Sequence, residues 1–159
     1  MTDPARRGEP VLALRPALLS DASRLLEWRN APEVRAASHH TEEIDLATHL
    51  RWLGKVLADP GRKIFIAEQG GAPVGMIRAD RMEDGIWELS WLVAPDFRQK
   101  GLGKVLLKSL FDIIQAPVRA EIKDWNLASI RMAEAAGMQL RRKEGGISYF
   151  EKAGEGNVD

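Results

Sequence analysis

The sequence predicts a mixed α/β (α+β) fold, in which a mostly antiparallel sheet of six or seven strands is flanked by about four helices. Three strand-like segments, residues 63–69, 73–82 and 86–93, are separated only by glycine-containing turns, which is typical of an antiparallel meander. An amphipathic helical pattern and the alternating segment 118–123 follow. A strand, a helix and a strand in succession indicate a local parallel pair, so we expect a mixed sheet.

Residues 11–152 are expected to form one domain, with disordered ends at 1–10 and 153–159, because 45% hydrophobic and 29% charged residues are ordinary for a globular chain. Basic and acidic side chains number 23 each, so no overall field favours nucleic acid. The chain has no cysteine and three histidines, which argues against a metal centre. Without a signal-like or long apolar segment, a cytoplasmic protein without membrane contact is expected. Monomer and homodimer both remain open.

The amino-terminal part predicts a short strand and two helices. Residues 11–17 form the strand, and Ser20 is the expected N-cap of the first helix. The inward side chains of this helix are expected to be Ala22, Leu25 and Leu26. The second helix begins after Asp45 and ends at residues 59–61. Its expected inward stripe comprises Leu46, Leu50, Leu53 and Leu57.

The carboxy-terminal half predicts two further helices and a hairpin. The first of these helices follows the meander, and its expected buried side chains are Leu102, Val105, Leu106, Leu110, Ile113 and Ile114. Residues 126–138 predict a last helix that ends at Gly137. Residues 138–152 then predict a hairpin that turns at the glycine pair 145–146.

The turn before the first of these helices has the pattern Arg98-x-x-Gly-x-Gly. A P-loop would need a glycine where Arg98 stands and a serine or threonine where Val105 stands. A dinucleotide-binding fingerprint would need a third glycine where Leu106 stands. Both of these nucleotide-binding motifs are therefore excluded.

An anion-binding turn remains as an interpretation of this pattern. The backbone N–H groups at a helix N-terminus are unpaired, and the helix dipole favours a phosphate there. Gly101 and Gly103 lack the Cβ atoms that would keep an anion away, while Arg98, Lys100 and Lys104 add positive charge. The alternative is an ordinary helix start with a solvated basic cluster.

The segments VAPDFRQKGLG and NLASIRMAEAAGM resemble the two central motifs of the GNAT superfamily of N-acetyltransferases, and the order of elements matches from about residue 11 to 152. The resemblance implies a sheet that splays between its fourth and fifth strands, where the pantetheine arm of acetyl-CoA enters. The residues that it assigns to acetyl-CoA are Leu92, Val93, Arg98, Gln99, Lys100, Gly101, Leu102, Gly103, Lys104, Asn126 and Ser129. For Asn126, a helix N-cap is the alternative role.

The same resemblance implies a catalytic arrangement. A backbone N–H near Val93 would polarise the thioester carbonyl, and Glu88 would help to deprotonate the amine, directly or through water. The alternative for Glu88 is an ion pair at the sheet surface. The tyrosine that often serves as general acid in this family is replaced by Ala133. Ser129, Tyr149, water or the substrate ammonium remain as proton donors.

The amino-terminal half resembles amino-sugar acetyltransferases of pseudaminic acid biosynthesis and, as an alternative, ribosomal-protein N-terminal acetyltransferases. The implied acceptor is a small molecule with a primary amine, first of all a nucleotide-linked amino sugar. The residues expected on the acceptor side are Trp28, Arg29, Asn30, Arg35, His40, His49 and Trp91. Packing in the core is the alternative for His49 and the tryptophans, and solvated charge is the alternative for the arginines. A module that binds acyl-CoA without turnover remains the hypothesis from another class.

Overall fold

A computed structural model describes residues 10–154 of the chain. The segments predicted to be disordered, 1–10 and 153–159, lie outside the described residues except for residues 10, 153 and 154. Seven strands form one sheet in the order β1-β2-β3-β4-β5-β7-β6. Every neighbouring pair is antiparallel except β4 and β5, which are parallel. The strands are β1 (Ala13–Pro16), β2 (Arg62–Gln69), β3 (Ala72–Arg81), β4 (Trp87–Val93), β5 (Val118–Lys123), β6 (Gln139–Glu144) and β7 (Ile147–Lys152). The predicted mixed sheet is confirmed.

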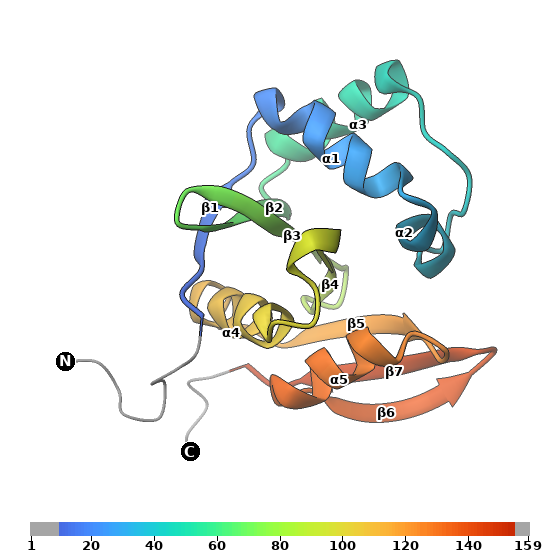
Figure 1. Cartoon of the computed structure of the whole chain (residues 1–159). Coiled ribbons are helices and arrows are strands. Elements are labelled where there is room, and N and C mark those ends of the chain that lie inside the picture. Colours follow the sequence, from blue (N-terminus) through green and yellow to red (C-terminus); the bar gives the residue numbers. More distant parts are fainter. Residues whose placement is uncertain (1–9, 155–159) are drawn as a thin grey trace.

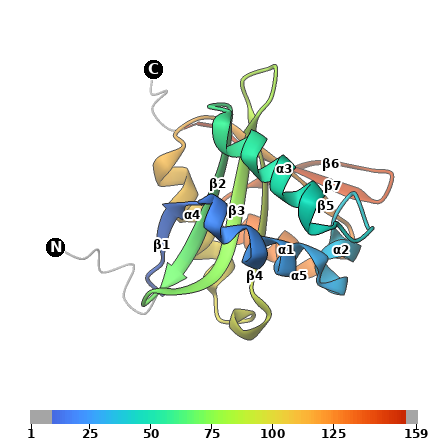
Figure 2. The ribbon, with the colours of Figure 1, turned by 90° about the horizontal axis from the view of Figure 1, so that it is seen from above.

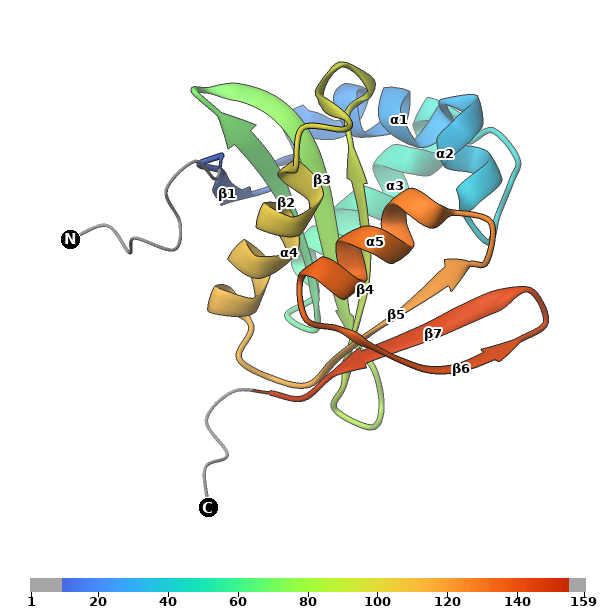
Figure 3. The same cartoon turned by 60° about the horizontal axis from the view of Figure 1, so that its bottom comes forward.

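Helices cover both faces of this sheet (Figure 1, Figure 3). They are α1 (Ala22–Asn30), α2 (Pro32–Ala37), α3 (Leu46–Ala58), α4 (Leu102–Ile113) and α5 (Leu127–Ala135). The first three lie on one face, with α1 and α3 crossing over the central strands, and α4 and α5 pack together on the other face (Figure 2). Within residues 10–154, no helix is long and apolar enough to cross a membrane.

Five α-helices are present where about four were expected, because the region after α1 contains the extra helix α2. Ala31 is extended, and Pro32 starts α2 at the position where a missing N–H costs nothing. The expected cap at Ser20 is wrong. Residues 19–21 form a 3₁₀ turn, in which the Asp21 carboxylate accepts the Leu18 N–H at 2.8 Å. The first α-helix therefore begins at Ala22 with Asp21 as its N-cap, one residue later than predicted.

Helix α3 begins at the predicted cap, because the Asp45 side chain accepts the Thr48 N–H at 2.8 Å. Its predicted leucine stripe is wrong. The buried side chains of α3 are His49, Leu53 and Val56, whereas Leu46, Leu50 and Leu57 are 50%, 37% and 39% exposed. The two stripes share Leu53 and differ by a small rotation of the helix. Burial of the His49 ring against Trp52, with ring centroids 5.6 Å apart, accompanies the observed rotation.

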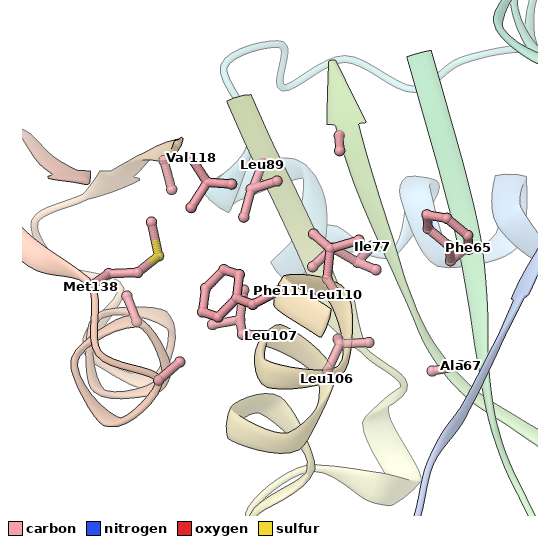
Figure 4. Packing of buried hydrophobic residues seen from close by; sticks show 14 of the residues in the cluster. Phe65, Ala67, Ile77, Leu89, Leu106, Leu107, Leu110, Phe111, Val118 and Met138 are labelled. Atoms are coloured by element: carbon pink, nitrogen blue, oxygen red, sulfur yellow. The ribbon is translucent and has the colours of Figure 1, made fainter. Parts of the chain in front are cut away.

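Two apolar clusters hold the layers together. The larger cluster lies between the sheet and α4–α5 and includes Leu89, Leu106, Leu107, Leu110, Phe111, Val118 and Met138 (Figure 4). The smaller cluster lies between the sheet and α1–α3 and includes Leu25, Trp28, Leu53 and Val56. The predicted inward face of α4 is confirmed in its main part, but Ile113 is 49% exposed. Phe111 and Leu107 occupy the buried face instead.

The parallel pair β4–β5 is short. Trp87–Leu89 pair with Val118–Ala120, and the two strands then diverge (Figure 3). From Ser90 to Val93, one edge of β4 has no strand beside it among the described residues. The splay expected between the fourth and fifth strands is thereby confirmed. The terminal hairpin is confirmed as well, and Gly145 and Gly146 make its turn with φ of 60° and 80°.

Candidate functional site

Two hydrogen bonds fix the direction in which each backbone group of β4 points. The Trp87 N–H donates to the Pro117 carbonyl at 3.0 Å, on the side of β5. The Ala94 N–H donates to the Val74 carbonyl at 2.8 Å, on the side of β3. Backbone groups alternate along a strand. Odd-numbered residues of β4 therefore turn their N–H and C=O toward β5, and even-numbered residues turn theirs toward β3.

The open edge of β4 consequently presents the backbone of Trp91 and Val93. The Val93 N–H, which the sequence nominated to polarise a carbonyl, points into the space between the diverging strands. Leu92 does not do so, because its register partner is Met76 and its backbone groups belong to the β3–β4 ladder. The expectation that Leu92 supplies backbone hydrogen bonds to a group between β4 and β5 is therefore wrong. Its side chain packs toward α1–α3.

The turn that follows β4 has the backbone shape of an anion cradle. Gln99 and Gly101 have φ of 62° and 75°, so two left-handed residues lie within three positions, and α4 begins at Leu102. Such turns direct successive N–H groups into one concavity, here at a helix N-terminus. Lys100 lies above the Phe97 ring, with Nζ 5.6 Å from the ring centroid. Residues 98–104 therefore fit a phosphate group by geometry and charge.

Glycine is required at Gly101 and at Gly103 for different physical reasons. Gly101 needs its positive φ, and a Cβ there would meet nothing within 4 Å. Gly103 is buried, and a Cβ there would overlap the Met132 side chain of α5, at 2.5 Å from Cγ. The expectation that Gly103 serves to let an anion approach is therefore corrected. It allows α4 and α5 to pack closely.

Arg98 lies at the end of the open edge and is held by two partners. Its Nε donates to the Val93 carbonyl at 3.0 Å, and its Nη1 lies 3.2 Å from Glu33 Oε1 on α2. The bond to Val93 fixes the guanidinium against the open edge. The bond to Glu33 connects the turn to the opposite helical layer. Arg98 thus points into the predicted site, with a carboxylate beside it that the sequence did not nominate.

Helix α2 is also tied to β5, on the other side of the splay. Lys123 Nζ donates to the Ala36 carbonyl at 2.8 Å, and His39 Nε2 lies 3.2 Å from Glu121 Oε2. Glu33 of α2 contacts Arg98, in the turn after β4, while Ala36 and His39 contact β5. Helix α2 and the residues that follow it therefore bridge the two diverging strands, β4 and β5. The region that was expected to be only a helix end and a loop therefore forms one wall of the site.

Glu88 lies at the base of the splay. It faces the side of α1–α3, as strand alternation predicted, since Leu89 and Val93 face the opposite cluster. Its Oε2 lies 3.5 Å from Arg119 Nε, and Arg119 also binds Asp84 at 2.7 Å. The ion pair that was the alternative role of Glu88 is thus present. Five residues of extended strand separate Glu88 from Val93, about 16 Å, so only a water chain could connect the carboxylate to a group at the Val93 N–H.

Asn126 has the structural role that was its alternative. Its Oδ1 accepts the Ser129 N–H at 3.3 Å and caps α5. Ala133 is completely buried in the core, so no hydroxyl stands at that position of α5. Tyr149 pairs in register with Glu121, and its ring lies under Arg142, 4.2 Å from the guanidinium carbon. Strand neighbours share a face, so Tyr149 lies on the side of α2 rather than of α5.

The expected acceptor residues on α1 and α2 hold the loop that follows α2. Asn30 binds Ile44 twice, through its Nδ2 at 2.8 Å and its Oδ1 at 2.9 Å. Arg29 Nη2 donates to the His40 carbonyl at 2.7 Å, and Arg35 Nε donates to the Asn30 carbonyl at 3.1 Å. The His40 side chain itself is exposed. These contacts shape the loop beside the splay, and they leave the buried Arg29 Nη1 without a hydrogen-bond partner among the described residues.

The aromatic residues divide between core and site. Trp28 is 7% exposed and belongs to the cluster between α1 and the sheet. His49 is 3% exposed, and burial lowers its pKa, an effect that a hydrogen bond to the Ala22 backbone partly offsets. His49 therefore has the role that was its alternative, a side chain packed in the core. The Trp91 Nε1 and the His49 Nε2 are both buried without a hydrogen-bond partner among the described residues, but only Trp91 lies on the open edge of β4. A donor of this kind beside the open edge fits a ligand carbonyl.

A hollow of about 310 Å³ adjoins the turn. It is lined by α1, α2, Leu92 and residues 94–98. A larger hollow of about 430 Å³ lies at Arg15, Ser20, Asp21 and the start of α1. Of these two hollows, the smaller one contains Leu92 of β4 and Arg98 of the turn, so we assign it to the site. Within residues 10–154, no three His, Asp or Glu side chains are grouped so that they could hold a metal ion.

The chain is similar to known proteins in sequence and in fold. Among curated proteins, the acetyltransferase PseH of Campylobacter jejuni subsp. jejuni is 28% identical over 86 residues, 54% of this chain and 53% of the relative. The chain thus spans about half the length of the curated relatives that it matches.

Solved structures share the fold. Aminoglycoside acetyltransferase AAC(6')-Ib in complex with coenzyme A has a TM-score of 0.78 at 22% identity, over 90% of this chain and 95% of that one. Ribosomal-protein-alanine N-acetyltransferase of Brucella melitensis has a TM-score of 0.75 at 25% identity, over 89% and 99% of the two chains. Residues 22–138 match the acetyltransferase (GNAT) family itself. The chain therefore belongs to the acetyltransferase (GNAT) family.

Proposed function

We propose that the protein is an N-acetyltransferase that moves the acetyl group of acetyl-CoA directly to the primary amine of a small polar acceptor, first of all a nucleotide-linked amino sugar. The observation that carries the first part is the open edge of β4, which leads into the turn of residues 98–104. An extended amide-containing arm fits beside such an edge, and a pyrophosphate fits the turn at its end. Family membership supports the same donor.

The residues of this chain would divide the work as follows. Acetyl-CoA supplies a thioester, whose carbonyl carbon gains the amine nitrogen while the bond to sulfur breaks. The Val93 N–H donates to the carbonyl oxygen, where negative charge develops, and the buried Trp91 Nε1 is a second donor on the same strand. Residues 98–104 hold the pyrophosphate, with Arg98 at the junction of turn and strand.

Two protons must move in this reaction. The amine loses one, and Glu88 would receive it through a water chain, because the strand places its carboxylate too far from the Val93 N–H for direct contact. The thiolate gains one. With Ala133 buried at the usual tyrosine position, we propose that water or the substrate ammonium supplies it. Tyr149 lies on the side of α2 and is not suited to that role, whereas Ser129, in the first turn of α5, stays the alternative donor.

The acceptor is inferred from charge and from similarity. Arginines of α1 and α2 lie beside the splay, and their planar donors suit phosphate. The partial similarity to acetyltransferase PseH supports an amino sugar. Solved neighbours include complexes with the aminoglycosides ribostamycin and kanamycin, but these polycations suit an acidic wall rather than one lined by arginines. A protein amino terminus is the second candidate, supported by the similarity to the ribosomal-protein-alanine N-acetyltransferase.

An acceptor screen tests the proposal. The chain has no cysteine, so a thiol reagent detects released CoA without any signal from the protein. We expect release with a uridine-diphosphate-linked amino sugar, and little with an aminoglycoside or an alanine-initiated peptide. Release with the peptide alone would establish the second candidate. Acetyl-CoA binding without release for any amine would instead identify a non-catalytic acyl-CoA-binding module.

A further inference from the structure

Three arginines from three separate elements come together on the face of the sheet beneath α1 and α2. Arg29 lies in the last turn of α1, Arg35 lies in α2, and Arg78 lies in β3. The pKa of Arg29 is lowered, first by burial and then by the positive charges of Arg78 and Arg35. Arg78 and Arg35 are therefore each within electrostatic reach of Arg29. Arg29 and Arg35 also donate to the neighbouring carbonyls of His40 and Thr41, at 2.7 Å and 3.4 Å. We call this group the arginine cluster.

Arg29 is the least compensated member of the arginine cluster. Its Nη2 donates to the His40 carbonyl at 2.7 Å, but its Nη1 is buried and has no hydrogen-bond partner in the part of the chain that the structure describes. Among residues 10–154, no carboxylate lies within 4.0 Å of its guanidinium. A half-buried cation with an unsatisfied donor is costly unless a ligand completes it.

The other two members have only shared or distant carboxylates. Arg78 Nε lies 3.1 Å from Asp80 Oδ2, although not in a direction that makes a hydrogen bond, and the other oxygen of Asp80 binds Arg62 at 3.0 Å. Arg35 has Glu43 at 3.9 Å, and that carboxylate side chain is 72% exposed. The carboxylates of the described residues therefore neutralise the arginine cluster only in part.

The position of Arg78 connects the arginine cluster to the chemistry. Arg78 pairs in register with Ser90 of β4, which lies between Glu88 and Leu92 on the same face. Ser90 is also the first residue of the open edge. A group bound by the cluster would consequently lie beside the open edge, on the side of the sheet opposite α4.

We infer that Arg29, Arg35 and Arg78 bind an oxyanionic group of the acceptor, a phosphate or a carboxylate, and thereby hold the acceptor's amine at the open edge of β4. This inference rests on the proposed acetyl transfer for its purpose but not for its test. Guanidinium groups suit both oxyanions because they offer planar paired donors. An acceptor with several positive charges is repelled by the same three groups. The cluster is therefore a determinant of specificity.

The test is anion binding to the protein already saturated with CoA, which keeps the probe out of the turn of residues 98–104. Calorimetry with inorganic pyrophosphate and with succinate provides two arms, one for phosphate and one for carboxylate acceptors. We expect one of the two to bind, and Arg29→Gln or Arg78→Gln to weaken that binding about tenfold. Arg141→Gln is the matched control, because Arg141 is exposed on β6 and pairs only with Glu151, at 3.4 Å. It should leave binding within about twofold.

Arg78 also lies over the Trp52 ring, 5.6 Å from its centroid, so Arg78→Gln could loosen the fold. Arg29→Gln tests the anion site without this contact. A circular dichroism spectrum and a melting temperature for each variant then separate a loss of anion binding from a loosened fold. Absence of binding by both anions, or equal binding by wild type and Arg29→Gln, overturns the arginine cluster as an anion site. Arginine-dependent binding in a protein that acetylates no amine would leave the site standing and remove the proposed function instead.

Discussion

Arg98 Nη1 lies 3.2 Å from Glu33 Oε1, so the turn that is proposed to hold a pyrophosphate is bound to a carboxylate of α2. The pyrophosphate and Glu33 would compete for one guanidinium. We predict that Glu33→Gln raises acetyl-CoA affinity by about two- to fivefold, which is the range expected for an exposed ion pair. Calorimetry at moderate ionic strength measures this. Glu42→Gln, at an exposed position outside the site, should change nothing, and equal affinities for wild type and Glu33→Gln would show that the pair does not oppose binding.

Glu88 is predicted to affect the rate rather than the binding of the donor. Glu88→Gln keeps the size of the side chain and removes its basicity, so turnover at neutral pH should fall by roughly ten- to a hundredfold, below the full range for a direct base because water intervenes. Higher pH should restore part of the rate, since more of the amine is then neutral in solution. Glu83→Gln is the control. A pH–rate profile equal to that of wild type would leave Glu88 with only its ion pair to Arg119.

Gly103 is predicted to matter for packing. Gly103→Ala places a Cβ against Met132 and should lower the free energy of unfolding by about 1–3 kcal/mol. The double variant with Met132→Ala should recover part of this loss. Gly54→Ala in α3, where a Cβ meets nothing within 4 Å, should instead stabilise by about 0.5–1 kcal/mol. Urea unfolding measures all three, and Gly103→Ala with wild-type stability would contradict the close approach of α4 to α5.

His49 predicts a pH dependence of stability. Burial lowers its pKa below the ordinary value of 6.5, so the unfolded chain binds the proton more readily than the folded one. The stabilisation that neutral His49 contributes is fully present above about pH 6.5 and is lost as the pH falls below that value. The free energy of unfolding then falls by at most about 1.4 kcal/mol per pH unit. Unfolding free energies at pH 7.5 and 5.5 should therefore differ less in His49→Gln than in wild type. His40→Gln, at an exposed position, should retain the wild-type difference.

The order of elements was predictable because each carries a strong local signal. The Gly145–Gly146 turn, the Asp45 cap and the alternation of β4 are properties of neighbouring residues, and all three are confirmed. Helix α2 was missed, although Pro32 after an extended residue is a known start signal. The rotation of α3 could not be read from periodicity, since both possible stripes pass through Leu53.

The parts of the site that are formed by neighbouring residues were predictable, but the contacts between separate elements were not. The turn and the open edge follow from motifs within β4 and the start of α4. The partners Glu33, Arg78 and Glu121 come from α2, β3 and β5, and nothing in their local sequence indicates that they meet. The direction of the Leu92 backbone also depends on the register with β3, which a single strand does not reveal. Tertiary register therefore decides which neighbours of a motif take part in the site.

The most direct test of the account is acetyl-CoA binding to Gln99→Glu, measured by calorimetry. Gln99 is exposed in the turn with φ of 62°, and the change adds one negative charge without altering the size of the side chain. If residues 98–104 hold the pyrophosphate, affinity should fall about tenfold while the melting temperature stays the same. Gln115→Glu, the same change just beyond the other end of α4, should leave affinity unaltered. Equal acetyl-CoA affinity for Gln99→Glu, Gln115→Glu and wild type would contradict the assignment of this turn, and with it the proposed function.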